Sequence, residues 1–199
     1  LQSKGVEMNF EKAAYSINKG LWGTSVGGRE TLQSKGMLPE EAWPTQVTKS
    51  AQEEIKLGFE KGELKLVNDK SFAHPAEAIQ YVQSIAGPFG IGRDIHVGDT
   101  IIGIKGRVGF EAAAPMVILK AHHALEKHVL TKWQLSWKDQ LAQFYGNWLH
   151  EGQILDPVMR DIEAFLENSQ QQVSGDVFIQ LMPYRFTVIG IESPYDLMS

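Results

Sequence analysis

Apolar and polar residues alternate in two short parts of the chain, which is the pattern of strands with one buried face. In the first part, apolar residues take every second position of 55–59 and again of 64–66, on either side of Lys61 and Gly62. A pair that contains glycine between two alternating runs favours a tight turn. We therefore expect one β hairpin here and a second over residues 177–191.

Longer segments repeat apolar residues every three or four positions, as one face of a helix does. Proline is tolerated in the first turn of a helix, and Asp156 is a good cap. We expect four helices, over residues 75–86, 114–131, 136–151 and from 157 onwards. Residues 100–104 are rich in β-formers and predict a further strand.

The predicted strands and helices occur in blocks and do not alternate strictly, which favours an α+β fold over a doubly wound sheet. We expect an antiparallel sheet built from the hairpins and packed with about four helices. Residues 1–50 carry many glycines and prolines, so we interpret them as an irregular, glycine-rich arm that precedes an α+β domain over 51–199.

Composition limits the classes of function. The formal net charge is -5, so a broad nucleic-acid-binding surface is not expected. The sequence contains no cysteine, which excludes disulfides and thiolate metal sites. No apolar run approaches the roughly 20 residues that a membrane span needs, and no signal peptide is visible, so we expect no membrane contact and a cytoplasmic location.

Two glycine patterns invite a nucleotide-binding interpretation. Residues 20–28 are rich in glycine, but no strand–loop–helix context and no GK[ST] motif accompany them. Gly90 and Gly92 lack the third glycine of a dinucleotide-binding loop. His122 and Glu126 share a helical face and are spaced to meet one metal ion, yet a hydrogen-bonded interior histidine explains the same spacing. We predict no metal site.

Lys105, Arg107 and Glu111 share one face if residues 105–111 form a strand. Two cations beside a carboxylate suit the zwitterion of an amino acid. A surface ion pair of little energetic value is an equally good interpretation. Ser16 and Ser25 are, by themselves, ordinary hydroxyl residues of the arm.

Three segments, in order, resemble the argininosuccinate synthase family. The first is YSINKGLWGTS over residues 15–25, and the second is the glycine-flanked strand, turn and helix over 92–130. The third is the closing hairpin over 173–199, with Glu-Ser-Pro at positions 192–194. The similarity covers essentially the whole chain, and the three segments together are specific although none is decisive alone.

The resemblance implies a ligase that joins citrulline and aspartate with ATP. In that chemistry the ureido oxygen attacks the α-phosphate and releases pyrophosphate, and the aspartate amine then displaces AMP from the citrullyl adenylate. ATP and Mg²⁺ would be bound mainly by an amino-terminal domain that this sequence does not include, so we expect a carboxyl-terminal part that binds no cofactor and is inactive alone. The family is tetrameric, and we expect a homotetramer here.

Site residues are carried over by position. Ser16 and Ser25 would contact citrulline. Gly98 and Phe110 fall where many members place a glutamate and a tyrosine that also touch citrulline, so two polar groups are missing. We predict that Asp99 replaces the lost carboxylate and that Phe110 lines the site. Lys105, Arg107 and Glu111 would support it. No catalytic residue is assigned.

Two other functions remain open. The chain is also suited to a non-catalytic module that self-associates through its aromatic helix over 136–151 and its hairpins. An unrelated protein that binds a small amino acid on the same fold is the third reading, because a fold does not fix a function.

Overall fold

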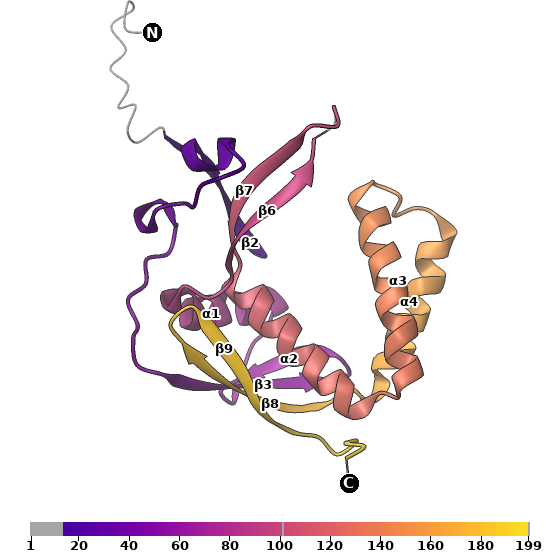
Figure 1. Ribbon diagram of the computed structural model, residues 1–199. Helices are drawn as coiled ribbons and strands as arrows, with labels where there is room; N and C mark the ends of the chain where they lie inside the picture. Colours follow the sequence, from indigo (N-terminus) through magenta and orange to yellow (C-terminus); the bar gives the residue numbers. More distant parts are fainter. Residues whose placement is uncertain (1–13, 101, 199) are drawn as a thin grey trace, which may run out of the picture. The chain divides into compact units, whose positions relative to one another are not determined.

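The computed structural model describes residues 14–100 and 102–198. Within them, nine strands form two sheets and accompany four α-helices, so the predicted α+β class is confirmed (Figure 1). The four-stranded sheet has the order β1-β2-β7-β6 and the five-stranded sheet the order β5-β4-β3-β8-β9.

Both predicted hairpins are confirmed, and both lie in the five-stranded sheet, as the neighbouring strand pairs β3–β4 and β8–β9. The strands of the four-stranded sheet are β1 (Tyr15–Gly20), β2 (Gly23–Gly28), β6 (Arg93–Asp99) and β7 (Lys105–Glu111). Those of the five-stranded sheet are β3 (Glu53–Glu60), β4 (Glu63–Val67), β5 (Lys70–Ser71), β8 (Gly175–Met182) and β9 (Arg185–Glu192).

The four helices lie close to the predicted ranges: α1 (Pro75–Ala86), α2 (Ala113–Val129), α3 (Lys132–His150) and α4 (Pro157–Ser169). Asp156 caps α4 as predicted, because its side chain accepts a hydrogen bond from the Val158 amide. α3 begins four residues earlier than predicted, where Thr131 and Gln134 form a reciprocal capping box.

Two local predictions are wrong. The segment 1–50 is not irregular throughout: β1 and β2 pair as an antiparallel hairpin, and β2 also pairs with β7. Backbone pairing with a distant strand overrode the glycine content. Residues 100 and 102–104 form no strand and instead connect β6 to β7, since Thr100 closes a turn against Ile104 and Gly103. Residues 1–13 of the predicted arm and Ile101 lie outside the described residues, and the domain boundary at 50 stays a prediction.

The chain forms two compact units. The first comprises residues up to Glu53 together with Ile79–Val117 and Leu181–Phe186; the second comprises Glu54–Ala78, Ile118–Gln180 and Thr187–Ser199. The second unit is held by apolar side chains that are almost completely buried: Leu57, Val67, Leu125, Met159, Val177 and Ile179.

One face of the four-stranded sheet is covered by the segment of residues 29–47. Leu38, Ala42 and Trp43 pack on Val26 of β2 to form a small buried core. Leu38 occupies the space in which a side chain at Gly109 of β7 would begin, so the glycine permits this close cover.

Two arginines fasten that segment to β6 and β7. The guanidinium of Arg93 donates to both carboxylate oxygens of Glu40, at 2.8 and 2.9 Å, and lies 5.2 Å from the Trp43 ring. Arg107 donates to backbone carbonyls of residues 33 and 36. Hydrogen bonds that engage a charged group are stronger than neutral ones, so these arginines hold a segment that has little regular structure of its own.

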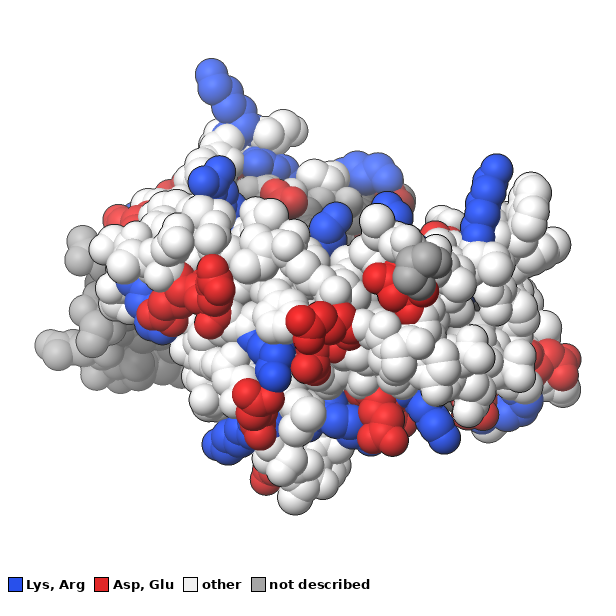
Figure 2. Space-filling view, turned by 90° about the horizontal axis from the view of Figure 1, so that it is seen from below, with Lys and Arg blue, Asp and Glu red and all other residues white. Residues whose placement is uncertain are grey.

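Among the residues that the structure describes, no helix is both long and apolar enough to cross a membrane. On the face shown in Figure 2, acidic and basic side chains are interspersed.

Candidate functional site

The register of the four-stranded sheet brings residues from distant parts of the sequence into one row. Asn18 of β1 lies opposite Ser25 of β2, Ser25 lies opposite Phe110 of β7, and Phe110 lies opposite Asp94 of β6. Residues directly opposite one another in neighbouring strands project from the same face. The row therefore runs across the face that residues 29–47 do not cover, which we call the open face.

Because side chains alternate along a strand, the open face also receives every second residue from this row. Ser16 is two positions before Asn18, and His96 and Gly98 are two and four positions after Asp94. All the positions carried over from the family for citrulline contacts, namely Ser16, Ser25, Gly98 and Phe110, thus share one face. This conclusion comes from the strand pairing alone.

Local contacts order the centre of the open face. Asn18 Nδ2 lies 3.5 Å from Ser25 Oγ, within reach of a weak hydrogen bond. The rings of His96 and Phe110 meet edge to face, with centroids 5.6 Å apart. A Cβ at Gly23 would collide with the Phe110 ring, and the Gly23 backbone has φ +142°, so only glycine fits at this position.

A pocket of about 570 Å³ opens beside this row. Its walls are largely aromatic or apolar, and its polar members include an acid, an imidazole and a guanidinium. Residues that line it include Trp22, Asp94, His96, Phe110, Met116 and Arg185. A few polar groups converging in a mostly apolar concavity are typical of small-molecule sites.

The predicted supporting residues lie on the covered face. Asp99 pairs with Lys105 directly opposite it, and both side chains are mostly exposed. Asp99 follows Gly98, so it projects away from Ser16 and Ser25. The structure does not bring Asp99 together with the serines.

Glu111 is buried on the covered face, where it pairs with Arg93 of β6. Arg107, on the same face, binds the carbonyls of residues 33 and 36. The three residues Lys105, Arg107 and Glu111 do share a face, as predicted, but each has its own structural partner. They do not form one cluster.

Comparison with known proteins decides the family. A sequence profile described as Arginosuccinate synthase C-terminal domain matches residues 15–199. The chain belongs to the argininosuccinate synthase family. The argininosuccinate synthase of Methanocaldococcus jannaschii is 35% identical over 201 residues, which cover 100% of this chain and 51% of that protein. That of Dehalococcoides mccartyi strain 195 is 37% identical over 190 residues, covering 94% and 47%. The chain therefore spans about half the length of these relatives.

Membership of the argininosuccinate synthase family gives the open face its context. Two residues beside it were not predicted from the sequence. Asp94 and Arg185 are charged residues that line the pocket, and no motif singles out either. For Asp94, a strand predicted over residues 93–99 would have been a usable signal. Asp94 lies two residues before His96 and four before Gly98, so all three positions share one face of that strand.

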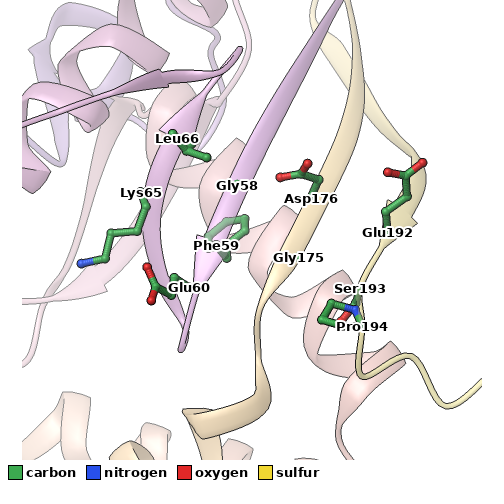
Figure 3. A pocket seen from close by; sticks show the side chains of 10 residues that line it. All are labelled: Gly58, Phe59, Glu60, Lys65, Leu66, Gly175, Asp176, Glu192, Ser193 and Pro194. Atoms are coloured by element: carbon green, nitrogen blue, oxygen red, sulfur yellow. The ribbon is translucent and has the colours of Figure 1, made fainter.

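A second hollow, of about 470 Å³, lies within the second unit. It runs over β3, β4 and β8 beside the end of β9, and Gly58 forms part of its floor (Figure 3). Asp176 points toward Gly58, whereas the Lys65 ammonium extends away. Lys56 Nζ lies 3.5 Å from the Asp176 carboxylate. None of the positions carried over for citrulline contacts lies here, but Glu192, Ser193 and Pro194 of the closing segment that resembles the family line this hollow.

His122 and Glu126 of α2 belong to a hydrogen-bond network that is largely buried. Glu126 is completely buried and accepts from Lys138 Nζ at 2.7 Å and from Gln170 Nε2 at 2.8 Å. His122 Nε2 lies 3.0 Å from Gln170 Oε1, and burial lowers the pKa of His122. Within the described residues, no group of three or more potential ligands is placed to hold a metal ion.

Proposed function

We propose that this chain supplies the carboxyl-terminal half of an ATP-dependent ligase that joins citrulline to aspartate, and that citrulline lies on the open face. One observation carries the proposal. The strand register gathers Ser16, Ser25, Gly98 and Phe110 on one face beside a ligand-sized pocket, although they come from separate parts of the sequence. Membership of the family supports the reaction.

The role of this half is to position a substrate. In the proposed reaction the ureido oxygen attacks the α-phosphate of ATP and expels pyrophosphate, which gives a citrullyl adenylate, and the aspartate amine then displaces AMP from that adenylate. The hydroxyls of Ser16 and Ser25 would orient the ureido group, and the Phe110 ring would support the aliphatic part. Correct placement of two reactants accounts for a large part of a rate enhancement, and phosphate chemistry needs little acid–base help from protein.

Mg²⁺ and the phosphates have no evident holder on the open face. Asp94 is its only carboxylate among the residues of the four strands. A hard cation prefers several oxygen ligands, and the described residues do not gather them there. The open face therefore does not fit Mg²⁺, and binding of the metal and of ATP is proposed for residues outside this sequence.

Pyrophosphate release with citrulline, aspartate and Mg-ATP tests the proposal. The full gene product that contains this chain should be active, and this chain alone should not. Ser25→Ala should raise KM for citrulline about threefold to tenfold, the effect of one lost hydrogen bond. Ser50→Ala, an exposed serine away from the open face, is the matched control. Activity in the full product without any change for Ser16→Ala or Ser25→Ala would place citrulline elsewhere.

Self-association is a second candidate function. None of the 19 residues of α3 is buried, although the helix carries several aromatic side chains. Trp133, Trp137 and Phe144 are 67%, 58% and 56% exposed. Apolar surface of this kind marks contact sites, so we propose that α3 is covered by a second copy of the chain. Sedimentation velocity should show that Trp133→Ser with Trp137→Ser shifts the protein toward monomer; an unchanged distribution refutes this role for α3.

A further inference from the structure

The open face carries a single carboxylate. Its residues, alternating along the four strands, include hydroxyl, amide and imidazole groups, but Asp94 is the only acid. The neighbouring acids project from the covered face and are occupied: Asp99 pairs with Lys105, and Glu111 pairs with Arg93. A positively charged group on a ligand of the open face therefore has one ionic partner in the sheet.

Asp94 is available to bind such a group. Its Oδ1 accepts only a local hydrogen bond, from the Ile95 amide at 2.7 Å. No ion pair of Asp94 occurs among the described residues, and its side chain is exposed at the pocket. A carboxylate has two oxygens and about four acceptor sites, so most of its capacity is unused.

An arginine, Arg185, lines the same pocket. Arg185 follows the turn between β8 and β9, where the Tyr184 amide donates to the Phe89 carbonyl at 2.7 Å and fixes the turn beside residues 89–92. Its only described contact is with Met182 Sδ at 3.4 Å, a weak acceptor. The first turn of α2, at Pro115 and Met116, lines the pocket too, and the start of a helix favours an anion.

These groups have the complementary charges of an α-amino acid. We propose that Asp94 binds the α-ammonium group and Arg185 the α-carboxylate of a free amino acid, whose side chain crosses Phe110 towards Ser25. Asp94 and Ser25 are separated by two inter-strand spacings, about 10 Å. That distance suits a long polar side chain such as the propyl-ureido group of citrulline. The inference rests on the proposed function for the identity of the amino acid, but not for the recognition of its head group.

Charge-neutralised ligands test the assignment. Calorimetry on the full gene product should show that Asp94→Asn weakens L-citrulline binding about tenfold, the value of a charged hydrogen bond. N-acetyl-L-citrulline, which lacks the ammonium, should bind the wild type and Asp94→Asn with equal, weak affinity. In the same way, Arg185→Gln should weaken the binding of citrulline but not the binding of citrulline carboxamide, which lacks the carboxylate. If Asp94 and Arg185 had only a structural role, these substitutions would weaken the binding of all of these ligands together.

Control variants and a conservative replacement complete the design. Asp161→Asn on α4 and Arg29→Gln change exposed charges of residues that do not line the pocket, and they should leave affinity unchanged. Asp94→Glu should restore most of the affinity. Equal binding of L-citrulline to wild type and Asp94→Asn overturns the inference, and it leaves the proposed function intact if Ser25→Ala still weakens binding.

Failure of the proposed function gives a different result. If the full gene product releases no pyrophosphate and does not bind citrulline, the twenty common α-amino acids replace it as probes. Asp94→Asn must then weaken the binding of whichever amino acid the wild type binds. If the wild type binds none of them, the assignment of Asp94 and Arg185 is wrong.

Discussion

Removing the charge of Glu126 should destabilise the second unit more than any surface substitution. Its side chain is fully buried, and it neutralises Lys138, whose side chain is only 18% exposed. Glu126→Gln keeps the shape but turns an amide donor toward either the ammonium or Gln170. Removing one partner of a buried ion pair costs about 3–5 kcal/mol of stability. Because Lys138 keeps some exposure to solvent, we expect a loss in the free energy of unfolding of about 3 kcal/mol.

Urea denaturation followed by circular dichroism measures this loss. With a slope of about 2 kcal/mol per molar urea, a loss of about 3 kcal/mol lowers the midpoint by about 1.5 M. Glu167→Gln on α4 is the matched control, because Glu167 is exposed, and it should shift the free energy of unfolding by less than about 0.5 kcal/mol.

A double substitution tests the reasoning itself. Glu126→Leu combined with Lys138→Met removes both charges, and Gln170 keeps a hydrogen bond to Ser169 Oγ at 3.2 Å. An apolar pair in place of a buried ion pair is often neutral, so the double variant should lie within about 1 kcal/mol of the wild type. If it loses as much as Glu126→Gln, or if Glu126→Gln loses less than about 0.5 kcal/mol, an unpaired buried charge is not the cause.

Two further outcomes follow from the site and from the network. A Cβ at Gly98 would meet no atom within 4 Å, so Gly98→Glu with Phe110→Tyr should fold normally and lower KM for citrulline about tenfold in the full gene product; an unchanged KM would show that the open face does not hold citrulline. Burial lowers the pKa of His122 in the folded state, so the unfolded chain binds this proton more readily, and stability should fall as pH drops below about 6.5. His122→Asn should flatten that part of the stability profile, and an identical pH dependence in both proteins would assign the effect to other groups.

Most of the fold was predictable because its signals are local. Periodicity located both hairpins of the second sheet, and the Asp156-Pro157 pair located the start of α4. The capping box at Thr131 was a usable signal that would have set the start of α3 correctly. The hairpin of β1 and β2 was missed because glycine in a strand weakens its local propensity, and pairing with β7, more than 80 positions away, supplies the stability.

The site was less predictable than the fold because it depends on register between distant strands. The resemblance identified Ser16 and Ser25, yet only the pairing of β2 with β7 and of β7 with β6 aligns them with Asp94. The same pairing separates Asp99 from Gly98, since a shift of one residue reverses the face. Arg185 could not be placed from sequence at all, because its position depends on how a turn packs beside residues 89–92.

The two arginines that fasten residues 29–47 have a consequence for how such a protein diverges. Arg93 and Asp94 are neighbours in sequence, but Arg93 projects from the covered face, where it pairs with Glu40 and Glu111, and Asp94 projects from the open face. Selection can therefore act on alternate positions of one strand independently. An exchange at an exposed position such as Asp94 therefore changes the chemistry of the open face without disturbing the buried core of Val26, Leu38 and Trp43, whereas Gly23 and Phe110, which pack on one another, are not open to such exchange.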